Sequence, residues 1–528
     1  MEHIELVLLG LLVAVAGLAL LAGVLRIPYP IFLVLGGLIL GFVPGVPETE
    51  LNPDLVLLIF LPPLLYAAAF FSSLRDLRAN VRPISLLAIG LVIATALTVA
   101  ATAHWVVGLS WPVAFVLGAI VSPTDVVAPA TILRRLGVPR RIITVVEGEN
   151  LTNDWTALVF YRFAVAAVVG GSFSLWQAGL GFLLTGPGGL VVGLGVAWVI
   201  AQVRRRIDDA MVEITISLFT GYAAYLLAEE LRLSGVIAAV TAGIYLGWRS
   251  SELYAPATRV QAYGVWELLQ FLLNAVLFVL IGLQLPRILE GISGEPLSVL
   301  LWWGVLVGVI VIVTRLVWVF VLTYLPRTLI RSMRERDPSP PWQQVLVVAW
   351  SGMRGSVSLA AALAVPLTTQ GGAPFPERNL IIFLTFCVLL ATLVVQGLSL
   401  PALIRALGIE DDGANELEEH AARLKVARRA VARVDQLAEE GWVREDTAQR
   451  MRGLYDYRRR RFAARFGDFD GGEEDYEGRS KIFQRFQHEV LRAEREELLR
   501  LRNEGLINDE VMRRVERDLD LEEARLEV

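Results

Sequence analysis

Long apolar runs occupy the first 406 residues of this sequence and constrain its fold more than any other feature. About 20 helical residues cross the hydrocarbon core of a bilayer, and most of the runs reach or approach that length. Read between charged residues and Pro/Gly breaks, the runs are 4–25, 30–46, 53–72, 83–108, 112–136, 142–170, 176–203, 210–230, 233–249, 258–286, 296–326, 341–368 and 377–406. We therefore expect an all-α polytopic membrane protein with about thirteen transmembrane helices.

The arginines between the runs support this count because they alternate along the chain. Cytoplasmic loops carry an excess of Lys and Arg. The rich linkers hold 18 arginines: Arg26, Arg75, Arg78, Arg82, Arg134, Arg135, Arg140, Arg141, Arg204, Arg205, Arg206, Arg249, Arg259, Arg327, Arg331, Arg334, Arg336 and Arg405. The other linkers hold only Arg232, Arg287 and Arg378. Thirteen spans then place the N-terminus outside and the C-terminal residues in the cytoplasm, as in a multi-pass protein of the inner membrane. Glu2 and Glu5, with no Lys or Arg before the first run, favour a span there over a signal peptide.

Residues 407–528 have a different composition. They hold 24 Lys or Arg and 31 Asp or Glu, with helical spacing of Leu, Val and Ala in 415–466 and 480–526. We expect a charged, helical cytoplasmic tail that follows a transmembrane domain at 1–406. The acidic loop 467–475 lacks the ligand and glycine spacing of an EF-hand, which favours a solvated loop. The net charge of −5 comes from the tail and gives no indication of nucleic-acid binding.

No motif indicates an enzyme or a cofactor. The four histidines show no HExxH spacing, no GxGD or GxSxG lies in a plausible span, and the tail has no GxGxxG. Cys387 is the only cysteine, so no disulfide can form within the chain.

The fifth run carries a polar group where a membrane span should have none. It reads Ser122-Pro123-Thr124-Asp125 and continues to Pro129. Because proline removes a backbone donor and strains the preceding turn, we expect a helix that is broken at mid-membrane beside Asp125. Irregular backbone at that depth is tolerated only around a buried polar site. The alternative is a proline kink in which Asp125 caps the second half-helix.

The sixth run carries further carboxylates. Glu149 and Asn153 lie four residues apart and share one helix face, while Asp154 is rotated by about 100° from Asn153. Glu147 is expected to be hydrated near the cytoplasmic end. Asp154 is not, because a long apolar stretch follows it. Ionisable groups at such depth are expensive and usually functional.

The twelfth run is interrupted by an arginine. Arg354 lies between Gly352 and Gly355, with apolar residues on both sides. If the seventh run is a linker, runs one to six and eight to thirteen form two halves, and the broken fifth and twelfth runs hold equivalent places. Corresponding broken helices indicate two inverted six-helix repeats. We expect structural ion pairs or interface roles for five other polar residues in or near the runs: Glu213, Glu267, Asn274, Arg162 and Arg315. We expect His104 to be packed or interfacial.

Three stretches resemble the monovalent cation–proton antiporter family, which includes bacterial NhaP-like proteins and animal sodium/proton exchangers. They are Ser122-Pro123-Thr124-Asp125, Glu149 through Asn153-Asp154, and Trp350-Ser351-Gly352-Met353-Arg354-Gly355, and the stretch from Trp266 to Leu283 resembles the family's tenth span. The resemblance covers about residues 1–406.

This resemblance implies a homodimer with an ion-carrying core domain at about 83–170 and 296–406. The dimerisation domain would take about 1–72 and 176–286. Asp154 would bind the cation and the proton, and Asp125 and Thr124 would line the crossing of the broken helices. Glu149 would pair with Arg354, and the Asn153-Asp154 pair resembles the electroneutral branch of the family.

The chemistry of the residues fits this function. Sodium is a hard cation that needs oxygen ligands, which Asp154, Asp125, the Thr124 carbonyl and Asn150 could supply. Proton and cation cannot both neutralise one carboxylate, so a shared site couples their fluxes. We expect antiport of Na⁺ or Li⁺ against H⁺ across the membrane. A K⁺/H⁺ or Ca²⁺/H⁺ antiporter of the same fold is the nearer alternative, and a cation channel is a more distant one.

Overall fold

The structure is a computed structural model. It describes residues 2–25, 28–43, 53–125, 127–170, 175–292, 296–329, 335, 339–440, 442–465 and 476–524. Within these ranges the secondary structure is helical, apart from one isolated bridge between Thr368 and Pro374. The contacts divide the chain into two units, Met1–Asp411 and Asp412–Val528. The acidic loop 467–475 lies outside the described residues.

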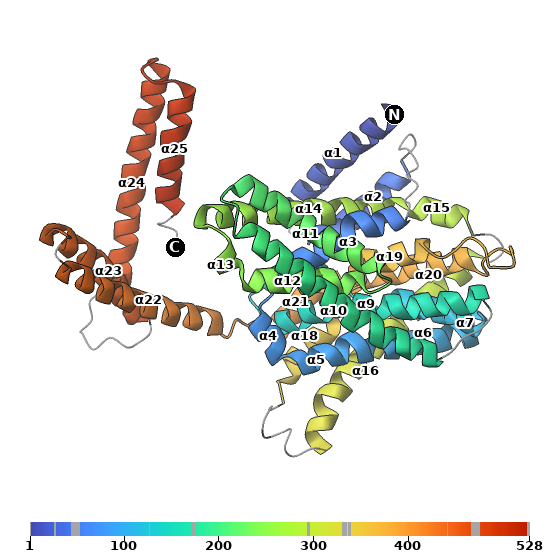
Figure 1. The fold of residues 1–528 in the computed structure, drawn as a ribbon. Coiled ribbons are helices and arrows are strands. Elements are labelled where there is room, and N and C mark those ends of the chain that lie inside the picture. Colours follow the sequence, from blue (N-terminus) through green and yellow to red (C-terminus); the bar gives the residue numbers. More distant parts are fainter. Residues whose placement is uncertain are drawn as a thin grey trace. The chain divides into compact units, whose positions relative to one another are not determined.

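Helices of the first unit pack side by side (Figure 1). They are α1 (Glu2–Leu25), α2 (Tyr29–Gly41), α3 (Pro53–Phe70), α4 (Leu74–Ala79), α5 (Val81–Ser85), η1 (Leu86–Leu91), α6 (Val92–Thr102), η2 (Ala103–Val107), α7 (Trp111–Val121), α8 (Val127–Arg135), α9 (Arg140–Gly170), α10 (Leu175–Arg204), α11 (Ala210–Glu230), α12 (Gly235–Trp248), α13 (Ser250–Leu253), α14 (Pro256–Leu283), α15 (Leu285–Glu290), α16 (Leu297–Leu329), α18 (Trp342–Trp350), α19 (Ser356–Leu363), α20 (Arg378–Ala391), η3 (Thr392–Gln396) and α21 (Gly397–Ala406). The elements η1, η2 and η3 are π-helical turns within longer helices.

Each apolar run of the sequence coincides with a helix or with a broken pair of helices. In the described part of the chain, six helices are long and apolar enough to cross a membrane, and five shorter apolar helices accompany them. The multi-pass helical architecture is therefore confirmed, whereas thirteen spans and inverted repeats stay predictions.

Two of the runs are broken where Pro and Gly predict it. The α7 helix ends at Val121 and α8 begins at Val127, with Pro123 between them. Pro129 lies in the first turn of α8, where a missing N–H costs little. The second break separates α18 from α19 and spans residues 351–355. Both breaks lie within the large hydrophobic cluster that joins α7, α9, α16, α18 and α20.

Small residues let two of the helices approach closely. Gly37 of α2 lies against the Val279 carbonyl of α14, and Gly282 of α14 lies against the Val34 carbonyl of α2. A side chain at either glycine would collide with backbone, so this crossing depends on both of them. A separate hydrophobic cluster joins α3 with α10, α11 and α12.

The second unit consists of charged helices. They are α22 (Ala414–Glu439), α23 (Glu445–Arg465), α24 (Tyr476–Asn503) and α25 (Asp509–Ala524). Helices α24 and α25 form a hairpin (Figure 1), across which Arg495 pairs with Asp520 at 2.5 Å and with Glu523 at 2.6 Å. The hydrogen bond from Arg495 holds the pKa of the Glu523 carboxyl below its usual value. Cross-helix ion pairs of this kind fit a solvated tail.

Candidate functional site

The two helix breaks meet in the interior of the first unit. The backbone N–H of Asp125 donates to the Met353 carbonyl at 2.8 Å, which joins the first break to the second. Gly355 lies directly against the Asp125 side chain, and a Cβ there would come within 2.7 Å of its Cγ. Close approach of the breaks therefore depends on the absence of a side chain at 355.

Arg354 closes the end of the first broken helix. Its side chain is fully buried, and its Nε donates to the Val121 carbonyl at 2.8 Å. Its Nη1 donates to the Gly352 carbonyl at 2.6 Å, and its backbone N–H donates to Thr392 Oγ1 at 3.0 Å. The last carbonyls of a helix lack intrahelical partners and carry partial negative charge, so a guanidinium there satisfies both needs.

Arg315 plays the same part for the second broken helix. Its Nε donates to the Ala349 carbonyl at 3.1 Å and its Nη2 to the Val348 carbonyl at 3.0 Å, at the end of α18. The two helices that end at the breaks, α7 and α18, therefore each have an arginine on their terminal carbonyls. The two arginines come from different elements, because Arg315 lies within α16 and Arg354 lies in the break after α18.

Glu149 pairs with Arg315, so the expected Glu149–Arg354 pair is wrong. The Arg315 guanidinium binds the carboxylate in a bidentate manner, with Nη1 on Oε1 and Nη2 on Oε2, the latter at 2.8 Å. Both side chains are buried. The Nε and Nη1 atoms of Arg354 are directed to the carbonyls of Val121 and Gly352, and its Nη2 atom has no hydrogen-bond partner among the described residues. The expectation of a structural role for Arg315 fits this pair.

A chain of polar side chains extends from the ion pair to the first break. The Thr124 hydroxyl donates to Glu149 Oε1 at 3.1 Å and accepts from Asn153 Nδ2 at 2.8 Å. The same amide lies 3.5 Å from the Thr124 carbonyl oxygen. Glu149 and Asn153 thus share the helix face that their spacing predicts, and that face holds Thr124 in place.

Asp154 lies next to this chain but outside it. It is 3% exposed, and its Oδ1 atom has no hydrogen-bond partner among the residues that the structure describes. A buried carboxylate oxygen without a donor is costly and points to a ligand that completes the site. Glu147, by contrast, pairs with Arg134 at 2.5 Å and is partly exposed, which fits its expected hydration.

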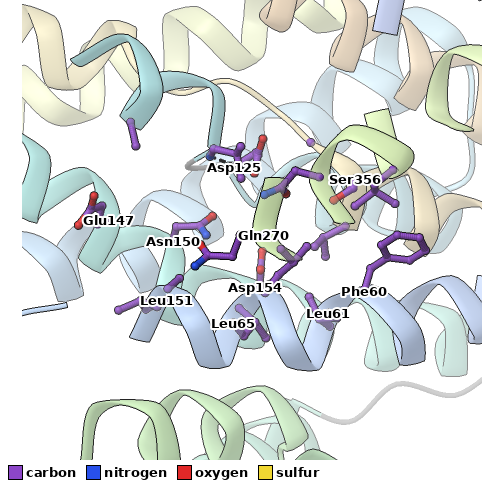
Figure 2. Close-up of a pocket in the computed structure, with 18 of the residues that line it drawn as sticks. Phe60, Leu61, Leu65, Asp125, Glu147, Asn150, Leu151, Asp154, Gln270 and Ser356 are labelled. Carbon is purple, nitrogen blue, oxygen red and sulfur yellow. Dashed lines mark hydrogen bonds between the residues drawn. The ribbon is translucent and has the colours of Figure 1, made fainter. Parts of the chain in front are cut away.

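A cavity of about 620 Å³ brings the predicted residues together. Figure 2 shows Asp125, Asn150 and Asp154 gathered around it, with Gln270 beside them. Its walls come from α3, α8, α9, α14 and α19 and from the first break. Thr124 and Glu147 also line it, whereas Asn153, Glu149 and Arg354 do not.

Polar residues of α14 and α19 complete the wall, and they were not predicted as site residues. Glu267, Gln270 and Asn274 follow one another at helical spacing along one face of α14. Ser356 and Ser358 of α19 face the same space. The helical spacing of these three residues on α14 could have indicated a polar face. Structural or interface roles are expected for Glu267 and Asn274 from the sequence, but that expectation leaves out Gln270 between them.

The atoms around the cavity that could bind a cation are the oxygen atoms of carboxylates, amides and hydroxyls. Within the described ranges, no group of three His, Cys, Asp or Glu side chains is arranged to hold a metal ion. Oxygen donors with few charges suit a hard cation of low charge better than a transition metal.

Comparisons with known proteins show which family this chain is similar to. The family profile described as sodium/hydrogen exchanger, transmembrane, matches residues 10–406. An uncharacterised Na⁺/H⁺ exchanger of Mycobacterium tuberculosis is 37% identical over 98% of this chain and 96% of that protein. A sodium, potassium, lithium and rubidium/H⁺ antiporter of Bacillus pumilus is 34% identical over 71% of this chain and 58% of that protein.

A solved structure shows the same fold. The sodium proton antiporter MjNhaP1 of Methanocaldococcus jannaschii superposes with a TM-score of 0.60 at 22% identity, over 77% of this chain and 98% of that one. The family profile spans most of the chain, and the mycobacterial relative aligns almost from end to end. The chain therefore belongs to the sodium/hydrogen exchanger family of membrane transport proteins.

Proposed function

We propose that this protein is a secondary antiporter that exchanges Na⁺ or Li⁺ for H⁺, with both ions competing for Asp154. The observation that carries the proposal is the Asp154 carboxylate, which is buried at the wall of a large cavity with one oxygen lacking a donor. A proton or a cation would satisfy that oxygen. Because one carboxylate takes only one of them at a time, uptake of one ion requires release of the other.

The charges around the breaks favour electroneutral exchange. Arg315 and Arg354 contribute two positive charges, and Glu149, Asp125 and Asp154 contribute three negative charges when ionised. The cluster therefore carries one net negative charge, which one proton or one monovalent cation neutralises. A neutral loaded site crosses a hydrophobic gate at lower cost than a charged one. A calcium ion would instead leave a net positive charge, which disfavours Ca²⁺/H⁺ exchange.

Asp154, Asp125, the Thr124 carbonyl and Asn150 are the proposed cation ligands, with water. Asn153 acts through Thr124, since its amide is engaged by the hydroxyl of that residue. Glu149 is the structural partner of Arg315 and holds the Thr124 loop. In this assignment, one carboxylate carries the exchanged ion and a second one lies next to it.

The cavity suggests how access alternates. Two of its walls, α3 and α14, belong to the proposed scaffold at about 1–72 and 176–286. Three others, α8, α9 and α19, belong to the proposed core at about 83–170 and 296–406. Rocking of the core with its inverted repeats against the scaffold would close the cavity on one side and open it on the other. We place thirteen spans in the cell membrane, with the N-terminus outside, the tail in the cytoplasm and the scaffold forming a homodimer.

Potassium is the second candidate cation. The Bacillus pumilus relative is named as an antiporter of potassium and rubidium as well as of sodium and lithium. The oxygen ligands proposed above do not by themselves exclude K⁺. The cavity and the charge count are the same for either ion, so selectivity must be measured.

Dissipation of a pH gradient in proteoliposomes tests the proposal. Addition of Na⁺ or Li⁺ should dissipate the gradient for the wild type and not for Asp154→Asn, and parallel additions of K⁺ and Ca²⁺ rank the ions. Glu147→Gln is the matched control, because Glu147 lines the same cavity but pairs with Arg134. Normal sodium-driven flux in Asp154→Asn would refute the assignment, and sodium flux without proton movement in the wild type would indicate a channel.

A further inference from the structure

The cavity beside Asp154 has a deep end and an exposed end, and α14 passes along both. Three polar residues of this helix line the cavity at helical spacing: Asn274 is buried, Gln270 is half-buried and Glu267 is exposed. At a rise of about 1.5 Å per residue, they extend over about 10 Å of the helix. Figure 2 shows Gln270 on the cavity wall with Asp154. This face of α14 therefore leads from the open end of the cavity towards the proposed ion site.

Glu267 is the charged member of this face. Between Arg259 and Arg287 the sequence contains no other Lys, Arg, Asp or Glu. An ionisable group within an apolar membrane run is costly, and such groups usually line a water-filled cavity or an ion pathway. The Glu267 side chain forms no ion pair or hydrogen bond with the residues that the structure describes. A structural ion pair or interface contact therefore does not account for its position.

The other charged residues described at the exposed end are engaged. Arg134 and Glu147 also line the cavity, and they pair with each other at 2.5 Å. Arg259, two turns before Glu267 on α14, donates from Nη2 to two backbone carbonyls, both at 3.1 Å. Among the described residues at this end, these contacts leave the Glu267 carboxylate as the charge without a counterion. A cation from solution is the natural partner for it.

We propose that Glu267 collects the exchanged cation from solution and directs it to Asp154. The carboxylate attracts the hydrated cation, and the amide oxygens of Gln270 and Asn274 provide successive contacts on the way into the cavity. This inference rests on the proposed antiport and adds the step by which the cation reaches its site. A charge at the mouth of a cavity with low-dielectric walls raises the local concentration of the opposite charge, and salt screens this effect.

The position of Glu267 separates cation capture from turnover. It lies on α14, which belongs to the proposed scaffold, whereas Asp154 belongs to the proposed core. Glu267 therefore does not travel with the loaded site and does not enter its charge balance. Loss of the Glu267 charge should weaken the apparent affinity for the cation and leave the maximal rate of exchange intact.

Sodium-driven proton movement in proteoliposomes, measured at two ionic strengths, tests this role. At about 10 mM ionic strength, Glu267→Gln should raise the KM for Na⁺ by about three- to tenfold, towards the lower end of electrostatic focusing effects, with an unchanged maximal rate. At about 150 mM, set with an impermeant salt, the difference should largely disappear, because the Debye length shortens from about 30 Å to about 8 Å. If K⁺ is the exchanged ion, the same shift applies to the KM for K⁺.

Three further variants separate the charge from the structure. Glu267→Asp retains the charge and should restore most of the affinity. Glu267→Lys reverses the charge and should raise the KM more than Glu267→Gln does. Glu252→Gln is the matched control, since Glu252 is an exposed carboxylate of α13 that does not line the cavity, and its KM should equal that of the wild type.

The possible outcomes distinguish this inference from the antiport on which it rests. Equal KM values for the wild type and Glu267→Gln at low ionic strength would overturn the inference alone. A lower maximal rate with unchanged KM in both Glu267→Gln and Glu267→Asp would assign the residue a structural role instead. A KM shift of the same size in Glu252→Gln would reduce the effect to general surface charge. Absence of cation-driven proton movement in the wild type would overturn the proposed function, and the role of Glu267 with it.

Discussion

A double-mutant cycle tests directly whether Glu149 is paired with Arg315, because it measures the coupling free energy between the two side chains. Arg315→Met removes the guanidinium and leaves the Glu149 carboxylate buried, with the Thr124 hydroxyl as its remaining donor among the described residues. It also frees the carbonyls of Val348 and Ala349 at the end of α18. Removal of one partner from a buried pair costs about 3–5 kcal/mol of unfolding free energy, because the other charge is stranded.

Single losses alone do not identify the partner, since Arg354→Met would also free two buried carbonyls. The cycle of Glu149→Gln with Arg315→Met should therefore be compared with the cycle of Glu149→Gln with Arg354→Met. Residues in direct contact show coupling of about 0.5–3 kcal/mol, and we expect the first cycle to fall in the upper part of that range. The second should be smaller, because those two side chains share no hydrogen bond in the described network.

Unfolding by SDS in mixed micelles, followed by tryptophan fluorescence, supplies the free energies. Asp154→Asn is the control for a buried charge change in the same helix. It should cost less than either arginine variant, because Asp154 forms no ion pair with the residues that the structure describes. Coupling of Glu149 to Arg354 that equals or exceeds its coupling to Arg315 would refute the assignment of partners.

Three further predictions concern transport. Gly355→Ala should reduce exchange strongly, because the added Cβ would displace Asp125. Gly264→Ala should leave exchange unchanged, because no atom lies within 4 Å of a Cβ at that position. Equal effects of the two substitutions would argue against the close approach of the breaks. Exchange by the wild type should not depend on an imposed potassium-diffusion potential, and a rate that changes with the sign of that potential would show that a second charge moves. Asn153→Asp should destabilise or disable the site before it makes transport electrogenic, because it removes the donor to Thr124 and adds a carboxylate beside Glu149; a stable, electrogenic variant would contradict this.

Much of the architecture could be predicted from the sequence because a bilayer permits few solutions. An apolar run must be a helix there, and two of the runs are broken beside Pro123 and between Gly352 and Gly355. Proline alone does not decide this, because Pro62, Pro63 and Pro187 lie inside continuous helices. Two carboxylates of the cavity wall could be predicted for the same reason, whereas its polar residues on α14 and α19 could not. Asp125 and Asp154 stand out because ionisable groups at that depth are rare.

The partner of Glu149 could not be predicted from spacing along the chain. Both candidate arginines are buried, and only the three-dimensional path of the breaks decides which guanidinium reaches the carboxylate. A signal did exist, since Arg315 is the only charged residue in the run 296–326 and therefore requires a partner. The unsatisfied end of α7 then explains why Arg354 turns to Val121 instead.

Proton release on sodium binding tests the shared site most directly. Purified protein in weakly buffered detergent solution should release one proton per protomer when Na⁺ is added at a pH where Asp154 is protonated. In that range the apparent Kd for Na⁺ should rise about tenfold for each unit by which the pH is lowered, as competition for one carboxylate requires. Asp154→Asn should release no proton, and Glu147→Gln should behave as the wild type. Proton release that persists in Asp154→Asn, or a Kd that does not depend on pH, would contradict competition at Asp154.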